Sequence, residues 1–213
     1  MNLLWMLLAA PFNERLATIR RVQEIPRSIF FSPKTTVALV NGLAAGAGAD
    51  LALCCDRIVF TPQSRFSLFY SRLGLIPDHG ALFLLARTLG ARRALTLALD
   101  AEVILGEEAV RLGIADAVLP RDDPALQRLL ERWSRVPSSC VTAAKQALWA
   151  TSGRAFEEAL EMVAALETRL LDGEEQRSLI ARTAQMQVLM QARQTRRTEE
   201  DASRVRLPHR REQ

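Results

Sequence analysis

Two acidic residues occupy otherwise apolar surroundings, where a carboxylate can do proton chemistry. Asp50 begins the stretch Asp50-Leu51-Ala52-Leu53-Cys54-Cys55, and a carboxylate about one turn into an apolar helix is costly unless it is paired or functional. Stabilisation by the positive end of the helix dipole is the alternative. Asp78 lies in Gly74-Leu75-Ile76-Pro77-Asp78-His79-Gly80, where an acid beside a histidine is a candidate general base. An Asx-type turn after Pro77 is the alternative, and His79 is either a partner of Asp78 or a plain loop residue.

A run of small residues, which we call the Gly/Ala segment (residues 43–49, LAAGAGA), precedes Asp50. Glycine and alanine let a backbone approach a ligand closely and leave amide N–H groups uncovered. With a helix dipole behind it, such a segment can hold a phosphate or the oxyanion of a thioester. The dinucleotide pattern fails because Leu51 stands where a third glycine is needed, and the Gly-Lys-Ser/Thr of a P-loop is absent. Tight packing with no ligand remains the alternative.

The predicted elements that position these residues change from strands to helices along the chain. Strands are predicted in the first third and helices in the last half, which indicates an α/β core followed by a helical region. The predicted strands cover residues 35–40, 56–60, 65–69 and 117–119. The predicted helices cover residues 13–31 (kinked at Pro26), 50–55, 81–88, 91–99, 107–112, 124–134, 138–150, 154–171 and 174–192.

Composition excludes several classes of protein. The chain has 213 residues, of which 49% are hydrophobic, so it can build a core and is not disordered as a whole. Three cysteines, Cys54, Cys55 and Cys140, do not form a disulfide framework, and we expect buried thiols in a reducing, cytoplasmic compartment. With two histidines and no ligand spacing, we expect no metal site.

The two ends of the chain differ. Residues 3–12 form an apolar run that is too short to span a membrane and lacks the basic start of a signal peptide, so we expect a buried segment. Residues 193–213 hold seven arginines and four acidic residues, so most of the net charge of +4 lies there. We expect this tail to be solvated and predict neither a nucleic-acid partner nor a membrane.

Two longer stretches resemble one known family. They are VNGLAAGAGADLALCCDRIVF (residues 40–60) and RFSLFYSRLGLIPDHG, which continues to AVRLGIADAVLP (residues 65–120). Their order of features is similar to that of the enoyl-CoA hydratase/isomerase (crotonase) family. The GLIPD form is most similar to its ring-epoxide phenylacetyl-CoA isomerase branch. The resemblance implies a crotonase-like ββα spiral core and a C-terminal helical trimerisation region.

The resemblance also implies roles for individual residues. Asp78 corresponds to the proton-shuttling aspartate of that branch. Asp50 aligns with the first glutamate of the hydratases, and Tyr70 stands in place of the second, which argues against efficient water addition. The amide of Ala47 matches an oxyanion-hole donor, and no cofactor is implied beyond the coenzyme A thioester substrate. The residues implied to line the substrate site are Ala45, Gly46, Gly48, Tyr70 and Pro77.

The function implied is an acyl-CoA isomerase, less readily a hydratase, that assembles as a homotrimer or a dimer of trimers. The expected organisation is a core over residues 1–150, a helical region over 151–192 and the basic tail. Family members carry further strands and a second oxyanion donor before the helix at residues 13–31. We therefore expect an N-terminally truncated core, through a mis-assigned start, a degraded gene or a piece supplied by a partner. A non-catalytic crotonase-fold protein is the alternative.

Overall fold

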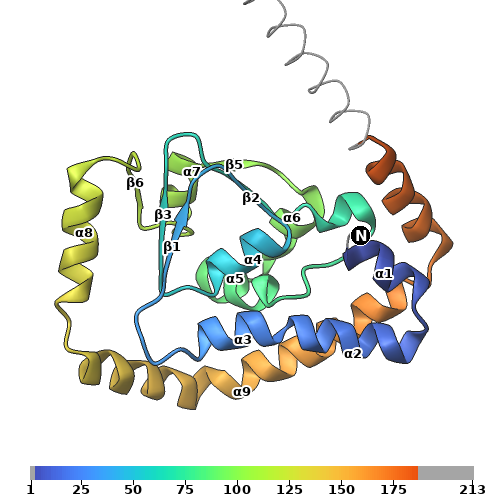
Figure 1. Cartoon of the computed structure of the whole chain (residues 1–213), viewed down its shortest axis with the longest axis horizontal. Helices are drawn as coiled ribbons and strands as arrows, with labels where there is room; N and C mark the ends of the chain where they lie inside the picture. The colour runs from blue at the N-terminus through green and yellow to red at the C-terminus, as the bar shows by residue number, and fades with distance from the viewer. Residues whose placement is uncertain (1–2, 187–213) are drawn as a thin grey trace, which may run out of the picture.

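A computed structural model describes residues 3–186, with side chains from Met6 onward, and its strands form two three-stranded sheets (Figure 1). In one sheet the order is β1-β3-β6, with all pairs parallel. In the other the order is β2-β4-β5, parallel between β2 and β4 and antiparallel between β4 and β5. The strands are β1 (Val37–Val40), β2 (Leu43–Ala45), β3 (Arg57–Phe60), β4 (Arg65–Ser67), β5 (Ile104–Leu105) and β6 (Ala117–Val118).

Asn41 and Gly42 join β1 to β2, so the chain changes sheet where the Gly/Ala segment begins. Gly42 has a φ of +122°, a backbone conformation that favours glycine. The core between the sheets and helices is apolar, and Val59, Phe60, Phe66 and Leu85 are fully or almost fully buried.

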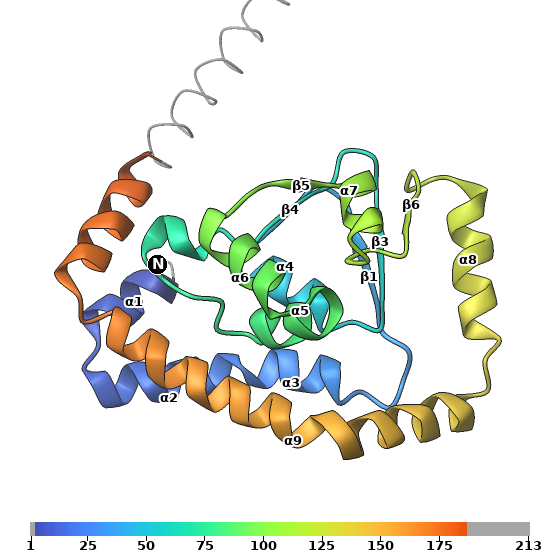
Figure 2. The same ribbon diagram turned by 180° about the vertical axis from the view of Figure 1, so that it is seen from behind.

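Helices pack around the sheets. Figures 1 and 2 show α2 and α3 following one another in a row along one edge of the molecule, with α9 running beside this row and α4 and α5 between it and the strands. The helices are α1 (Leu3–Ala9), α2 (Phe12–Val22), α3 (Glu24–Phe30), α4 (Ala47–Leu53), α5 (Ala81–Leu89), α6 (Ala91–Asp100), α7 (Gly106–Arg111), α8 (Pro124–Ser134) and α9 (Ser138–Leu170), with one 3₁₀ turn, η1 (Tyr70–Leu73). Residues 174–186 are also helical.

The α/β architecture and most of the predicted elements are confirmed. The strands β1, β3, β4 and β6 and the helices α4 to α8 lie within one to three residues of the predicted bounds. The short strands β2 and β5 were missed. They have three and two residues, and their extended shape comes from pairing with β4 rather than from a local pattern.

Two helix predictions were wrong. The helices predicted over residues 138–150 and 154–171 are one helix of 33 residues, α9, and the expected boundary between residues 150 and 151 falls inside it. Gly153 does not end this helix because it is buried against the ring of Phe31, where a side chain would be crowded. The break in residues 13–31 comes at Gln23 rather than at Pro26, because Pro26 lies in the first turn of α3, where its missing N–H costs nothing.

Two burial predictions were also wrong in part. Of the described side chains in the apolar run, Leu7 is buried, but Met6 and Phe12 are 47% and 38% exposed. Cys54 is buried, whereas Cys55 is half-buried and Cys140 is exposed, and all three thiols are free. Among residues 3–186, no helix is long and apolar enough to cross a membrane. The basic tail over residues 193–213 and the end of the helix predicted over 174–192 lie outside the described residues.

Candidate active site

The carboxylate of Asp50 is fully buried and paired, and α4 places it there. Gly46 caps this helix with a φ of +54° and a ψ of −126°, which aims Asp50 into the interior one turn later. Its Oδ2 accepts hydrogen bonds from the hydroxyl of Tyr70 (3.0 Å) and from the backbone N–H of His79 (3.1 Å). The pKa of Asp50 is raised to about 7, chiefly by burial. The charge of His79 and the hydrogen bond from Tyr70 lower this pKa, while the charge of Asp78 raises it. Hydrogen bonds therefore engage one oxygen of this buried acid, while its Oδ1 has no hydrogen-bond partner among the described residues.

Tyr70 occupies the position at which the resemblance implies a second carboxylate. It opens η1 and is 9% exposed, and Phe69 before it takes a left-handed conformation (φ 51°) that turns the chain sharply. Burial, and after it the neighbouring Asp50, raises the pKa of Tyr70 well above its usual value. Tyr70 is therefore a neutral hydrogen-bond donor that holds Asp50, and it offers no base.

Asp78 and His79 form a contacting acid–imidazole pair beside Asp50. The Nδ1 atom of His79 lies 2.6 Å from Oδ1 of Asp78 and 3.9 Å from Oδ2 of Asp50. Burial alone lowers the pKa of His79, but the hydrogen bond and charge of Asp78 and the charge of Asp50 outweigh it and raise the pKa overall. The side chain of Asp78 keeps 12% of its surface exposed, whereas that of Asp50 keeps none. Asp78 is thus the carboxylate that a bound molecule can reach.

The ligand atoms of Asp50, Asp78 and His79 all lie within 4.8 Å of one another, which raises the question of a metal ion. Two donors on one first-row ion, each about 2.1 Å from it, stand roughly 3 Å apart. The contact of 2.6 Å between Asp78 and His79 is shorter than that and is a direct ion-pair contact. As they lie, the three side chains therefore form an ion-pair cluster rather than a set of metal ligands.

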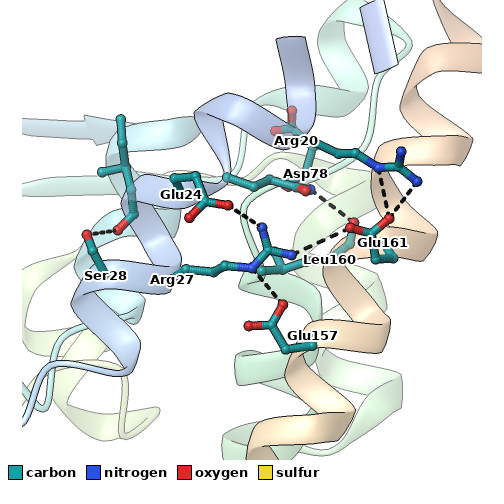
Figure 3. A network of polar contacts seen from close by, with 10 residues as sticks. Arg20, Glu24, Arg27, Ser28, Asp78, Glu157, Leu160 and Glu161 are labelled. Atoms are coloured by element: carbon teal, nitrogen blue, oxygen red, sulfur yellow. Dashed lines mark hydrogen bonds and ion pairs between the residues drawn. The ribbon is translucent and has the colours of Figure 1, made fainter. Parts of the chain in front are cut away.

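The loop that carries Asp78 (residues 74–80, the Asp78 loop) is held from α2 and α9. The side-chain amide of Gln23, which is fully buried, donates to the backbone oxygens of Asp78 (2.7 Å) and Leu160 (3.0 Å). Around this point, Figure 3 shows Arg20 and Arg27 reaching across to Glu157 and Glu161 on α9, close to Asp78 and Leu160. The ion pairs at the surface thus cover a buried polar link to the loop.

Glu167 on α9 holds the other end of the Asp78 loop. It is 3% exposed, and its Oε2 accepts a hydrogen bond from the backbone N–H of Ile76 at 3.2 Å. Burial, and after it the charge of Asp78, raises the pKa of Glu167 to about 8. Sequence reasoning missed both Gln23 and Glu167. They lie 55 and 91 positions from the residues that they bind, and nothing in the local pattern singles them out.

The Gly/Ala segment offers free backbone donors at the molecular surface. Ala47 is the first residue of α4 and is exposed, so its N–H has no acceptor within the helix. The N–H of Gly46 is used, because it donates to the oxygen of Ser67 on β4 at 3.1 Å. Gly48 lines a groove of about 350 Å³ together with residues of β1, β2 and α4. Of the predicted substrate-site residues, Ala45 and Gly46 are half-buried, while Pro77 is buried beside Asp78.

The structure therefore brings Asp50, Tyr70 and Asp78 together. A scan of protein families matches residues 10–189 of this chain to the enoyl-CoA hydratase/isomerase family. The chain belongs to this family, and its α/β core with a helical C-terminal part is the crotonase fold.

Individual relatives carry more than one activity in their names. The chain is 35% identical to a "Probable enoyl-CoA hydratase" of Rhodobacter capsulatus over 159 residues, which are 73% of this chain and 62% of the relative. It is 35% identical to the 1,2-epoxyphenylacetyl-CoA isomerase of Escherichia coli over 61% of this chain and 50% of the relative. A solved enoyl-CoA hydratase from Mycobacterium avium subsp. paratuberculosis superposes with a TM-score of 0.73, at 28% identity, over 80% of this chain and 72% of that one. The chain thus spans between half and about three fifths of these two curated relatives.

Proposed function

We propose that this protein is an acyl-CoA isomerase that moves a proton, and with it a double bond, next to a coenzyme A thioester. The observation that carries the proposal is the contrast between a partly exposed carboxylate, Asp78, and a wholly buried one, Asp50, that lie in one cluster. Two carboxylates that both face the substrate are what water addition needs. Here Tyr70 takes the place of the second, which favours isomerisation over hydration.

In the proposed reaction the carboxylate of Asp78 takes a proton from the carbon beside the thioester carbonyl. The electron pair of the broken C–H bond moves onto the carbonyl oxygen and forms an enolate. The N–H of Ala47 donates to this oxyanion, and one such donor typically stabilises the transition state by roughly 3–4 kcal/mol. Asp78 then returns the proton to another carbon of the conjugated system, so no co-reactant is consumed. Residues 45, 46, 48, 70 and 77 are proposed to line the acyl site.

In this proposal Asp50 is a positioning residue and does not contact the substrate, since none of its side chain is exposed. It holds the backbone of His79 and the hydroxyl of Tyr70, and His79 in turn orients the carboxylate of Asp78. The names of the relatives support both possible reactions, because they include an enoyl-CoA hydratase and an epoxyphenylacetyl-CoA isomerase.

The test is turnover of 3-enoyl-CoA and 2-enoyl-CoA thioesters by the full chain and by Asp78→Asn. We expect Asp78→Asn to reduce isomerisation by about 10²–10⁴-fold, the usual contribution of a general base. Asp122→Asn is the matched control, because Asp122 is exposed on the loop before α8. Isomerisation that survives Asp78→Asn unchanged would overturn the role of the base, and faster hydration than isomerisation would overturn the reaction class.

A second candidate is a non-catalytic crotonase-fold protein that binds acyl-CoA or acts through assembly. The observation that favours it is the enclosure of the acids, since Tyr70 binds Asp50 and the side chain of Asp78 keeps only 12% of its surface exposed. Binding of acyl-CoA without turnover, measured by calorimetry on the same chain, would support this candidate over the isomerase.

We also propose a homotrimer or a dimer of trimers, with α9 in its interface. The face of α9 turned away from its own core exposes apolar side chains, with Leu148 and Met162 at 64% and 66% exposure. The mass of the particle from light scattering tests this, and a monomer would contradict it. The cytoplasmic location stays a prediction from the free cysteines.

A further inference from the structure

We propose that Glu167, near the end of α9, is a positioning residue of the active site that sets the orientation of Asp78 through the Asp78 loop. The inference rests on the function proposed above, in which Asp78 is the base. Neither the sequence pattern nor the family resemblance points to this residue.

Glu167 accepts a hydrogen bond from Ile76, which lies two residues before the proposed base, Asp78. Glu167 is 3% exposed, and its Oε2 lies 3.2 Å from the backbone nitrogen of Ile76. A rigid Pro77 separates Ile76 from Asp78, so a displacement of Ile76 is passed on to the carboxylate.

Glu167 belongs to a buried face of α9 that supports the whole Asp78 loop. Phe156, Leu160 and Ala164 on this face are fully buried, and the backbone oxygen of Leu160 shares the amide of Gln23 with that of Asp78. Gly80, at the far end of the loop, is pressed against the ring of Phe156. Glu167 supplies the polar contact near the start of the loop, at Ile76.

The charges around Glu167 decide which protonation state supports the loop. The charges of Asp78 and Asp50 both raise the pKa of Glu167, and Tyr70 on η1 is close enough for the charge of Glu167 to raise its own pKa. On the side of α2, Arg15 is engaged elsewhere: it pairs with Asp172 at 2.6 Å and donates to the backbone of Thr168. Protonated Glu167 therefore accepts from Ile76 without adding a further negative charge beside Asp78. Ionised Glu167 accepts more strongly from Ile76, but repulsion by Asp78 outweighs this gain and loosens the loop.

The first experiment compares the pH profiles of isomerisation by the full chain, Glu167→Gln and Glu167→Ala. The amide oxygen of Gln still accepts from Ile76 but does not ionise, so we expect near wild-type kcat at pH 7. The fall in activity above about pH 8 should be lost in this variant. Glu167→Ala leaves the N–H of Ile76 without an acceptor, and we expect kcat to drop by about 10–100-fold at every pH, the usual cost of a misplaced catalytic group.

Glu158→Gln is the matched control, because Glu158 is on the same helix but its side chain is 64% exposed. The inference is overturned if Glu167→Gln keeps the fall above pH 8 in place, or if Glu167→Ala retains full kcat. Both results require a wild-type chain that turns substrate over.

A second experiment needs no substrate and therefore separates a failure of this inference from a failure of the proposed function. The pKa of Glu167 is raised from 4.5 to about 8, so between these values the unfolded chain releases a proton that the folded chain keeps. Stability of the wild type should therefore fall relative to Glu167→Gln as the pH rises from 5 to 8, and the gap in Tm should stay constant above 8. A gap that does not change with pH would show an ordinary exposed acid and overturn the inference, whatever the activity.

Discussion

The Gly/Ala segment and the Asp78 loop are two short stretches that serve the same site in opposite ways. The first is at the surface, with Ala47 and Gly48 exposed, and its backbone N–H groups are the functional atoms. The second is buried from Pro77 to Gly80, and its functional atom is on a side chain. One segment must stay open, and the other must be held still.

The difference lies in what fixes each stretch. The Gly/Ala segment is fixed locally, by β2 pairing with β4 and by the cap at Gly46. The Asp78 loop is fixed from far along the chain, by Gln23, Phe156 and Glu167. A donor site can therefore be encoded by a few adjacent small residues, whereas the position of a base depends on the whole packing of α2 and α9 behind it.

The largest expected effect tests the open segment through Ala47→Pro. Proline removes the N–H of Ala47, which is the proposed oxyanion donor, and costs little in structure, because the first residue of a helix tolerates proline. We expect kcat for isomerisation to fall by about 10²–10³-fold with almost no change in Tm.

Ala47→Ser is the control, since it keeps the N–H and the same place at the start of α4. It should retain most of the activity. If the proline variant were as active as the serine variant, the oxyanion donor would have to be sought elsewhere in the segment.

The next largest effect tests the held loop through Gly80→Ala, with Gly48→Ala as its counterpart in the open segment. A methyl group on Gly80 would lie 2.5 Å from Cε2 of Phe156, and the φ of +99° disfavours any side chain. We expect the free energy of unfolding to fall by about 2–5 kcal/mol from overpacking and backbone strain together. Gly48 has nothing within 4 Å of the same methyl position, so Gly48→Ala should be neutral or stabilise α4 by up to about 1 kcal/mol. Urea unfolding measures both, and equal losses would remove the contrast between the two segments.

The parts of the site that are fixed locally could be predicted from the sequence, and the parts that are fixed from distant helices could not. The strand, small-residue and apolar-helix pattern of residues 37–55 is local, so β1, α4 and the candidate residue Asp50 could be predicted from it, whereas Ala47 was named only through the family resemblance. Asp78 was also found, because an acid beside Pro77 and His79 is unusual in an apolar turn. The supports of the Asp78 loop could not be predicted, since nothing local marks Gln23, between α2 and α3, or Glu167, on α9, until these helices pack on the loop. For the same reason the course of α9 through Gly153 was missed.

The smallest effect concerns the surface network that covers the held loop. Arg20 contacts Glu161 at 2.8 Å, but the two side chains are 52% and 45% exposed, so water and salt screen the pair. We expect Arg20→Gln to reduce the free energy of unfolding by less than about 1 kcal/mol and to do so less in high salt, measured by urea unfolding at two salt concentrations. The buried amide of Gln23 would then carry the link between α2, α9 and Asp78 without help from the surface ions. A loss as large as that of Gly80→Ala, or one insensitive to salt, would show instead that the ion pairs on α9 help to hold the base in place.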